Sequence, residues 1–437
     1  MTRLFFTLST VFLCSAWSLA AASDEVPGAP QTKPVALTNA VVHTIQDRPL
    51  ARGTLLFENG VITAVGAKVK IPKGAQVIDL DGQHVYPGLI ESMSQIGLRE
   101  VSAVRASVDD GETGRINPNV KAHIAFNPDS EVIPVTRANG VLVAMSAPVG
   151  GRVSGYASVM QLDGWTWEQM MLKAGAGLMV NWPYPGRNSS SEDLEELRDL
   201  IEDARAYHAA RRVPNSDQAF DIRLDALAPV LNGSTPLIAA ANDVRSIQAA
   251  VAFAQQYELK LIIFGGHDAE QCADLLKRHD IPVIIDSVLR RPRRRHEPYD
   301  AAYTLAARLS QRGVKFCISG CGREETWNSR NLPYHAAMAA AHGLSYAEAL
   351  RSVTQYPAEI LGLADRLGTL EVGKDATLIV TSGDPLEINT QVHRAWVQGR
   401  VVQLSSRHTR LNDKYEQKYE QLQQSSKQKV KKAAAGE

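Results

Sequence analysis

The stretch that decides the fold is TPLIAAANDVRSIQAAVAFAQQYELKLIIFGGHDAEQCADLLKRHDIPVIIDSV, residues 235–288. Three short, continuously apolar runs alternate here with two segments whose apolar residues recur every three or four positions. Continuous apolar runs are typical of strands buried on both faces, and the three-four spacing is typical of helices, the first with Asp243 placed to cap it. The alternation predicts parallel strands joined by crossover helices.

Similar units extend this pattern in both directions along the chain. Apolar runs recur at residues 140–147 and 313–320, and helical patterns recur at residues 191–212 and 299–312. Several strand–helix units within about 280 residues suit a (β/α)8 barrel. We place this barrel at residues 87–365.

The two flanks of the barrel have a different pattern. Residues 35–86 and 366–404 contain short alternating strands separated by glycine turns, including the hairpin signal Asn59-Gly60. Because the chain enters and leaves the barrel through such strands, we expect both flanks to build one split β-sandwich. The fold class is therefore α/β, with a (β/α)8 TIM barrel inserted into a small β-sandwich.

The ends of the chain read as segments outside these domains. Residues 1–22 combine Arg3, an apolar run and a small-residue cleavage pattern, which predicts a signal peptide. Residues 23–34 form a polar, proline-rich linker, and residues 405–437 form a charged tail that is a solvated helix or disordered. We expect a periplasmic or secreted protein with no integral membrane segment after cleavage.

Composition excludes one class of partner. The 437 residues carry 47 Lys+Arg and 47 Asp+Glu, so the formal net charge is zero. No excess of cations exists to neutralise phosphates, and we expect no nucleic-acid partner. A small-molecule ligand and an oligomer both remain open.

Three motifs carry a family resemblance, and they occur in order along the chain. They are GVITAVG at residues 60–66, VYPGLIE at residues 85–91, and LGTLEVGKDA at residues 367–376 followed by GDPL. With these motifs the chain resembles the amidohydrolase superfamily, and within it the imidazolonepropionase-like branch. The resemblance implies a metal-dependent (β/α)8 hydrolase that cleaves non-peptide C–N bonds in cyclic amides or related substrates.

The sequence departs from the family where the resemblance would place the metal ligands. In the family, strand one continues into a His-x-His pair, and further ligands and a catalytic acid follow on later strands. The corresponding positions here are Met93, Gln95, Ala240, Phe264 and Gly320. Thioether, amide and hydrocarbon groups are poor partners for zinc or iron. We therefore predict a degenerate metal-ligand motif, no bound metal and no cofactor; a divalent metal is expected only where the family site is intact.

Three further polar residues lie at or just after predicted strand ends and could line the same mouth. A fourth, Glu91, lies within strand one and is either part of the mouth or a buried acid bonded to backbone. The complete candidate pocket is Glu91, Met93, Gln95, Ala240, Phe264, His267, Asp286, Ser319 and Gly320. His267-Asp268 also fits a helix start, with Asp268 facing the helix dipole. The basic run Arg290–His296 indicates an anionic contact or a solvated loop, and the sequence assigns no catalytic residue.

Two functions therefore stay open. The first is a hydrolase of C–N bonds that uses an unrecognised or metal-free site. The second is a non-catalytic periplasmic pseudo-amidohydrolase that acts as a binding or assembly protein. The metal content of the mature protein separates the two most directly.

Overall fold

The larger half of the molecule is a nearly closed barrel of eight strands. The computed structural model describes residues 25–183, 191–215, 217–320 and 326–434, so the predicted signal peptide lies outside the described residues. The barrel sheet has the order β13-β12-β11-β10-β9-β8-β7-β6. Its strands are β6 (Leu89–Ser94), β7 (Val141–Ser146), β8 (Val153–Gln161), β9 (Met171–Asn181), β10 (Leu237–Ala241), β11 (Leu261–Gly265), β12 (Val283–Asp286) and β13 (Phe316–Ser319). This confirms the barrel predicted from the apolar runs.

One barrel strand differs from the parallel arrangement expected. β8 runs antiparallel to both β7 and β9, and the other strands pair in parallel. An antiparallel pair can be joined by a short connection, whereas a parallel pair needs a crossover. Accordingly only six residues separate β7 from β8, and the four-residue helix α2 (Trp167–Met170) lies between β8 and β9.

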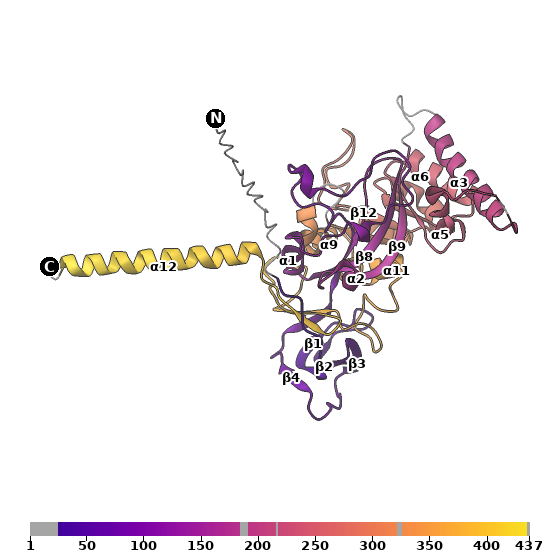
Figure 1. Ribbon diagram of the computed structural model, residues 1–437. Coiled ribbons are helices and arrows are strands. Elements are labelled where there is room, and N and C mark those ends of the chain that lie inside the picture. The colour runs from indigo at the N-terminus through magenta and orange to yellow at the C-terminus, as the bar shows by residue number, and fades with distance from the viewer. Residues whose placement is uncertain (1–24, 184–190, 216, 321–325, 435–437) are drawn as a thin grey trace, which may run out of the picture.

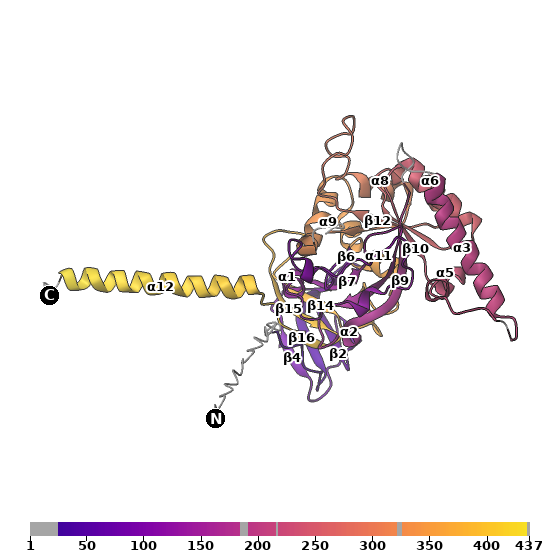
Figure 2. The same cartoon turned by 45° about the horizontal axis from the view of Figure 1, so that its top comes forward.

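Helices cover the outside of the barrel on the β10–β13 side (Figure 2). α6 follows β10, and Asp243 caps it by accepting a hydrogen bond from the Ser246 amide at 3.1 Å. The helices are α1 (Val132–Arg137), α3 (Ser191–Arg211), α4 (Ile222–Asp225), α5 (Ala228–Leu231), α6 (Val244–Gln256), α7 (Ala273–Arg278), α8 (Leu305–Arg312), α9 (Leu332–Ala341), α10 (Tyr346–Arg351) and α11 (Gln355–Ile360). Short 3-10 turns are η1 (Arg105–Ser107), η2 (Ala122–Ile124), η3 (Ala269–Cys272) and η4 (Thr326–Asn331).

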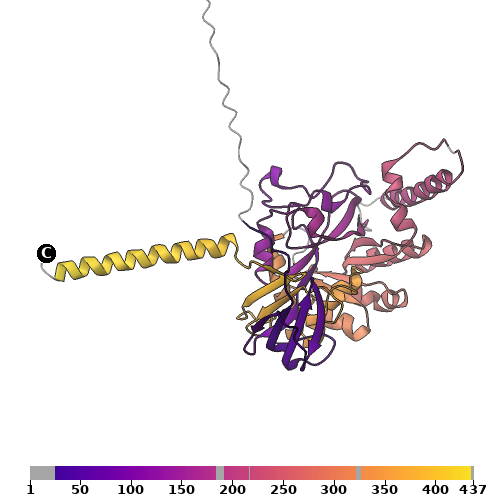
Figure 3. The ribbon, with the colours of Figure 1, turned by 60° about the horizontal axis from the view of Figure 1, so that its bottom comes forward.

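Strands from both flanks share a second sheet, as predicted (Figure 3). Its order is β16-β15-β14-β5-β1-β2-β3, with β4 also paired to β1. The strands are β1 (Val35–Val42), β2 (Leu50–Glu58), β3 (Val61–Gly66), β4 (Gln76–Asp79), β5 (His84–Pro87), β14 (Leu378–Thr381), β15 (Val392–Val397) and β16 (Arg400–Val402). Phe57 of β2 and Trp396 of β15 are far apart in this order, yet their rings meet edge to face at 5.8 Å. The sheet therefore folds over itself around a core, as a sandwich does.

The connection after β6 and the segment predicted as a linker both lie against the barrel. The connection after β6 pairs with β8 through the bridges Ile116–Val153 and Lys121–Tyr156. In the linker, the Gly28 amide donates to the Asp163 carboxylate at 3.2 Å. Neither segment is a free tether in the described residues.

The C-terminal tail is a single long helix, α12 (Arg407–Ala434), that stands away from the body (Figure 1). Its described side chains are exposed beyond the first turn, including Leu411, Tyr415 and Tyr419. Within the described ranges, no helix is both long enough and apolar enough to span a bilayer.

Candidate functional site

The first and last barrel strands, β6 and β13, meet at a seam closed by side chains. Ser92 Oγ on β6 donates to the Ile318 carbonyl at 3.3 Å, and Ser319 Oγ on β13 donates to the Met93 carbonyl at 3.0 Å. All four residues are fully buried. The described backbone has no ladder between these two strands, so the serine hydroxyls take over part of the role that ladder hydrogen bonds have elsewhere.

Glu91 lies at the centre of this seam and is fully buried. Its Oε1 accepts from the Met93 amide at 3.2 Å, and its Oε2 accepts from the Gly320 amide at 2.9 Å. Burial raises the pKa of the carboxyl to about 7, although the amide donors favour the charged form. Glu91 therefore joins the two strands by hydrogen bonds and has no solvent-facing surface at which to act on a substrate.

Three of the predicted ligand positions are packed into the apolar interior of the barrel. Met93 is fully buried, Phe264 is 2% exposed, and Ala240 packs against the same cluster. Ala240 and Phe264 are direct partners in the β10–β11 register. Their neighbours in this cluster include Ile90, Val143, Met179, Ile238 and Ile284. Hydrocarbon and thioether groups thus fill the space below the mouth.

Gln95 follows β6 and is the polar exception. Its carbonyl accepts from the amides of Leu98 and Arg99, at 2.9 and 3.1 Å. Its side-chain amide is fully buried, and neither the oxygen nor the nitrogen has a hydrogen-bond partner among the described residues. One neutral amide can supply at most a single weak ligand to a metal.

His267 and Asp286 lie together beside the seam, because Asp286 is the register partner of Ser319 in the β12–β13 pair. His267 follows β11 through Gly265 and Gly266, whose φ values of 92° and 58° fall in the left-handed region that favours glycine. The turn brings His267 Nε2 to 3.8 Å from Asp286 Oδ2 at the end of β12. The candidate pocket thus contains the seam residues, the apolar group and the His267–Asp286 pair, and this pair adjoins the seam at Ser319.

Two arginines near His267 complete a cavity that the sequence pattern did not assign. Arg290 follows β12 within the basic run, and Arg308 lies on α8. The run of arginines was the available signal for Arg290. The sequence contains no such signal for Arg308, because its contact with Glu270, at 3.3 Å, arises only from the packing of α8 against η3. Asp268, weighed as a helix cap, makes no cap bond with its side chain and instead binds Arg294.

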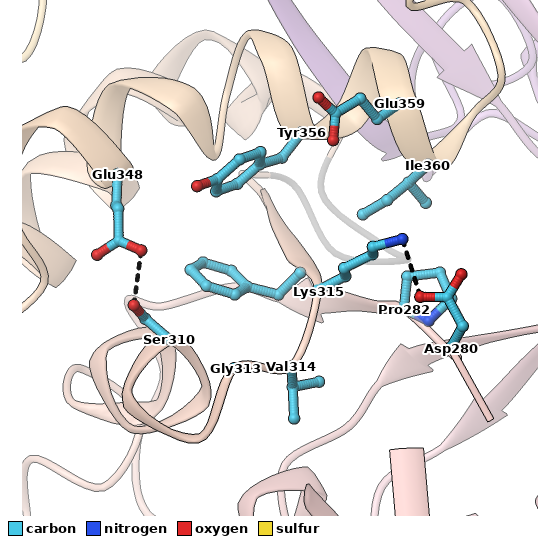
Figure 4. Close-up of a pocket in the computed structure, with 11 residues that line it drawn as sticks. Asp280, Pro282, Ser310, Gly313, Val314, Lys315, Glu348, Tyr356, Glu359 and Ile360 are labelled. Atoms are coloured by element: carbon cyan, nitrogen blue, oxygen red, sulfur yellow. Dashed lines mark hydrogen bonds and ion pairs between the residues drawn. The ribbon is translucent and has the colours of Figure 1, made fainter. Parts of the chain in front are cut away.

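A larger cavity of about 460 Å³ lies at the opposite end of the barrel, where β12 and β13 begin (Figure 4). Phe316 and Tyr356 form its apolar wall, with their ring centroids 5.9 Å apart. Its polar groups are paired with each other or with neighbours: Lys315 with Asp280 at 2.8 Å, Ser310 with Glu348 at 2.7 Å, and Gln355 with Glu359 at 2.7 Å. The N-terminal ends of barrel strands contribute to stability and not to catalysis. The mutual pairing of the polar groups at this end therefore indicates a structural region.

Comparisons with known proteins agree with this architecture. A model of the amidohydrolase family matches residues 300–405. The crystal structure of an amidohydrolase from Thermotoga maritima MSB8 superposes with a TM-score of 0.78 and 28% sequence identity, covering 84% of this chain and 99% of that one. These similarities support assignment to the amidohydrolase superfamily. The imidazolonepropionase of Mesorhizobium japonicum is 24% identical over 362 residues, which are 75% of this chain and 86% of the relative.

A further superfamily relative is the amidohydrolase tasK of Hapsidospora irregularis. It is 22% identical over 413 residues, which are 82% of this chain but only 41% of the relative. This chain thus matches less than half of that protein's length. The family model, in turn, matches the last strand–helix unit and β14–β16, and it does not include β6 with Met93 and Gln95.

The superfamily implies a divalent metal at the barrel mouth, and the described residues there do not fit one. The donor set at the predicted positions is a thioether, an orphan amide and three groups with no side-chain donor. Among the residues that the structure describes, no group of three or more His, Cys, Asp and Glu side chains is arranged to hold a metal ion. A catalytic zinc needs three protein ligands of the imidazole, thiolate or carboxylate type.

Proposed function

We propose that this amidohydrolase-superfamily chain has lost the metal ligands and works as a non-catalytic binding protein, with the barrel retained as a scaffold. One observation carries the proposal. Met93, Ala240 and Phe264, the residues at the positions where the resemblance would place metal ligands, pack into one apolar cluster inside the barrel. Metal-dependent hydrolysis needs a bound water with a lowered pKa and an open coordination position, and this cluster provides neither.

Glu91 offers no route to metal-free hydrolysis. A general base must come within hydrogen-bond reach of the proton that it removes. Both Glu91 oxygens instead accept backbone amides at the seam, and the side chain is fully buried. Cleavage of a cyclic amide, the activity implied by the imidazolonepropionase resemblance, therefore has no assigned base or acid.

The test is the metal content of the purified mature protein, measured by inductively coupled plasma mass spectrometry. We expect far less than one equivalent of zinc, iron or manganese, and no change in melting temperature on chelation. A stoichiometric metal that is lost on chelation together with stability would contradict the proposal. As a constructive control, Met93→His with Gln95→His should not create hydrolysis, because Phe264 and Gly320 still supply no ligand or proton shuttle.

Export is part of the same proposal. The apolar segment and the small-residue pattern before Ser23 support cleavage near that residue and a periplasmic or secreted protein. Mass spectrometry of the protein from the native cell should give a mature chain that begins close to Ser23. An intact Met1 would contradict export by cleavage.

A further inference from the structure

A cavity of about 200 Å³ opens on the β11–β12 side of the barrel mouth. Its wall is made by the segment after β11, the segment after β12 and the start of α8. The side chains that matter are His267, Asp268, Glu270, Arg290, Arg294 and Arg308. The carboxyl ends of barrel strands are where this fold places its functional groups.

The acidic side chains of this cavity are already paired. Asp268 accepts two hydrogen bonds from Arg294, at 2.9 and 2.6 Å, in a bidentate pair. Glu270 pairs with Arg308 at 3.3 Å. Glu297 also lines the cavity; it lies 3.3 Å from Arg294 and accepts from the Arg293 amide at 2.8 Å. The three carboxylates are therefore paired with Arg294, Arg308 and a backbone amide.

Arg290 makes no ion pair within 4.0 Å among the described residues, although the charges of Glu297, Asp286 and Asp268 favour its charged form. Its Nη1 makes one long hydrogen bond, to the Arg291 carbonyl at 3.4 Å, and its Nε is buried without a partner among the described residues. The Nε of Arg308 is buried and unpartnered in the same way. An unpaired guanidinium that has lost part of its water carries a substantial desolvation cost, which a bound anion would offset.

His267 adds an independent observation. Its side chain is only 8% exposed, and both ring nitrogens are buried without a hydrogen-bond partner among the described residues. Burial, with the nearby arginines, lowers the pKa of His267 to about 3, so the ring is neutral and carries one N–H donor. Unsatisfied buried polar groups are rare in folded proteins, and several around one cavity indicate a missing ligand.

We propose that this cavity binds a small oxyanion, the carboxylate or phosphate group of a ligand, with the Arg290 guanidinium as its charge partner. His267 and Arg308 Nε supply further donors. Guanidinium groups recognise planar and tetrahedral oxyanions through paired N–H groups, and the cavity is large enough for such a group. The inference deepens the proposed binding role and rests on it, because it names the chemistry of the ligand.

Calorimetric titration of the mature protein with sodium acetate and, separately, inorganic phosphate tests the inference at constant ionic strength. We expect saturable binding of at least one of the two, and the stronger one identifies the ligand group. Arg290→Gln should weaken this binding roughly tenfold or more. Arg295→Gln is the matched control: it removes the same charge from the same basic run, but its side chain is exposed and lies outside the cavity wall.

Stability without anion gives a second measurement. Arg290 is a partly buried cation without an ion pair, so the melting temperature of Arg290→Gln in chloride buffer should be no lower than that of the wild type. Removing a residue that forms a structural ion pair would lower the melting temperature. If Arg290→Gln does not fold, His267→Phe takes its place in the experiment. This substitution keeps an aromatic ring at the position and removes both ring nitrogens. Equal binding by the wild type and either variant, or binding with no saturation, would overturn the anion site.

The two proposals fail in different ways. A metal-loaded protein whose acetate or phosphate binding still depends on Arg290 would overturn the proposed function and support the anion site. A metal-free protein with no saturable anion binding would leave the proposed function standing and overturn the anion site.

Discussion

The β6–β13 seam and the β11–β12 side of the barrel mouth differ in how their buried side chains are hydrogen-bonded, with Gln95 beside the seam as an exception whose side-chain amide lacks partners in the described chain. At the β6–β13 seam, Glu91, Ser92 and Ser319 all have hydrogen-bond partners at 2.9 to 3.3 Å. On the β11–β12 side, His267 and Arg290 keep buried atoms without partners in the described chain. Satisfied groups hold a structure closed, whereas unsatisfied groups cost stability and persist where a ligand can satisfy them. The difference separates a structural half of the mouth from a binding half.

The largest expected effect comes from restoring an acid at the seam with Gly320→Asp. A Cβ at this position would lie 2.9 Å from Leu332 Cα and 3.1 Å from Glu91 Oε2. The new side chain would collide with the α9 backbone and place a second carboxylate beside Glu91. We expect a loss of roughly 3–5 kcal/mol in the free energy of unfolding, measured by chemical denaturation.

Gly66→Asp is the matched control for that prediction. Its nearest neighbour to an added Cβ is Val69 Cγ2 at 3.9 Å, so the same substitution meets open space. It should cost less than about 1 kcal/mol. Equal losses in the two variants would show that the seam is not closed tightly at Gly320.

The second effect is the pH dependence of stability that arises from Glu91. Its pKa rises from 4.5 to about 7 on folding, so the folded state binds more protons between these values. Stability contributed by this group is complete below about pH 4.5 and is lost as the pH rises through about 7, by on the order of 3 kcal/mol. Denaturation from about pH 5 to about pH 8 should show this loss in the wild type but not in Glu91→Gln.

The comparison of wild type with Glu91→Gln also isolates this contribution from other titrating groups. The neighbouring Cys317 stays protonated, because burial raises the pKa of its thiol to about 12. Buried histidines such as His335, whose pKa is lowered to about 4 by burial, are common to both proteins and contribute with the opposite sign. Parallel pH curves for the two proteins would place the charge-sensitive group elsewhere.

A smaller effect is expected from Ser319→Ala at the seam. The change removes the 3.0 Å hydrogen bond from the buried Ser319 hydroxyl to the Met93 carbonyl. The free energy of unfolding should fall by about 1–2 kcal/mol. No loss in a urea titration would mean that the serine hydroxyls do not hold the seam.

The smallest effect, and one of opposite sign, is expected from His267→Phe on the binding side. The substitution keeps a ring in the cavity wall and removes two nitrogens that have no partner in the described chain. In the absence of an anion we expect unchanged stability or a gain of up to about 1 kcal/mol. A loss as large as that of Ser319→Ala would show that both sides of the mouth are structural.

The fold could be predicted where the residue types of one segment alone show that a strand is buried. The runs at 235–288 are continuously apolar because their strands are buried on both faces, and they became β10, β11 and β12. β8 gave no such signal, although all nine of its residues are buried. It contains polar Ser154, Ser158 and Gln161, and Ser158 Oγ meets its partner, His123 Nδ1 at 2.8 Å, only through the tertiary fold. Partners of that kind are not visible in a linear pattern.

The candidate site was predicted in part for the same reason. Residue type alone shows that Met93 and Phe264 are poor metal ligands, but not that both pack into one cluster. Glu91 could be placed on a buried strand, whereas its link to Gly320 spans 229 positions. Arg308 could not be found at all, since its place in the cavity depends on how α8 packs against the segment after β11.

The seam has a consequence for how the chain folds during synthesis. Ser92 and Ile318, which it joins, lie 226 positions apart, and β5 must likewise wait for β14 to complete the second sheet. At about 5–20 residues per second, translation leaves the first strands of both sheets without their final neighbours for some tens of seconds. Long-range closure of this kind is slow, so we expect neither unit to reach its native state on the ribosome. Both sheets therefore stay open until the last third of the chain has been synthesised.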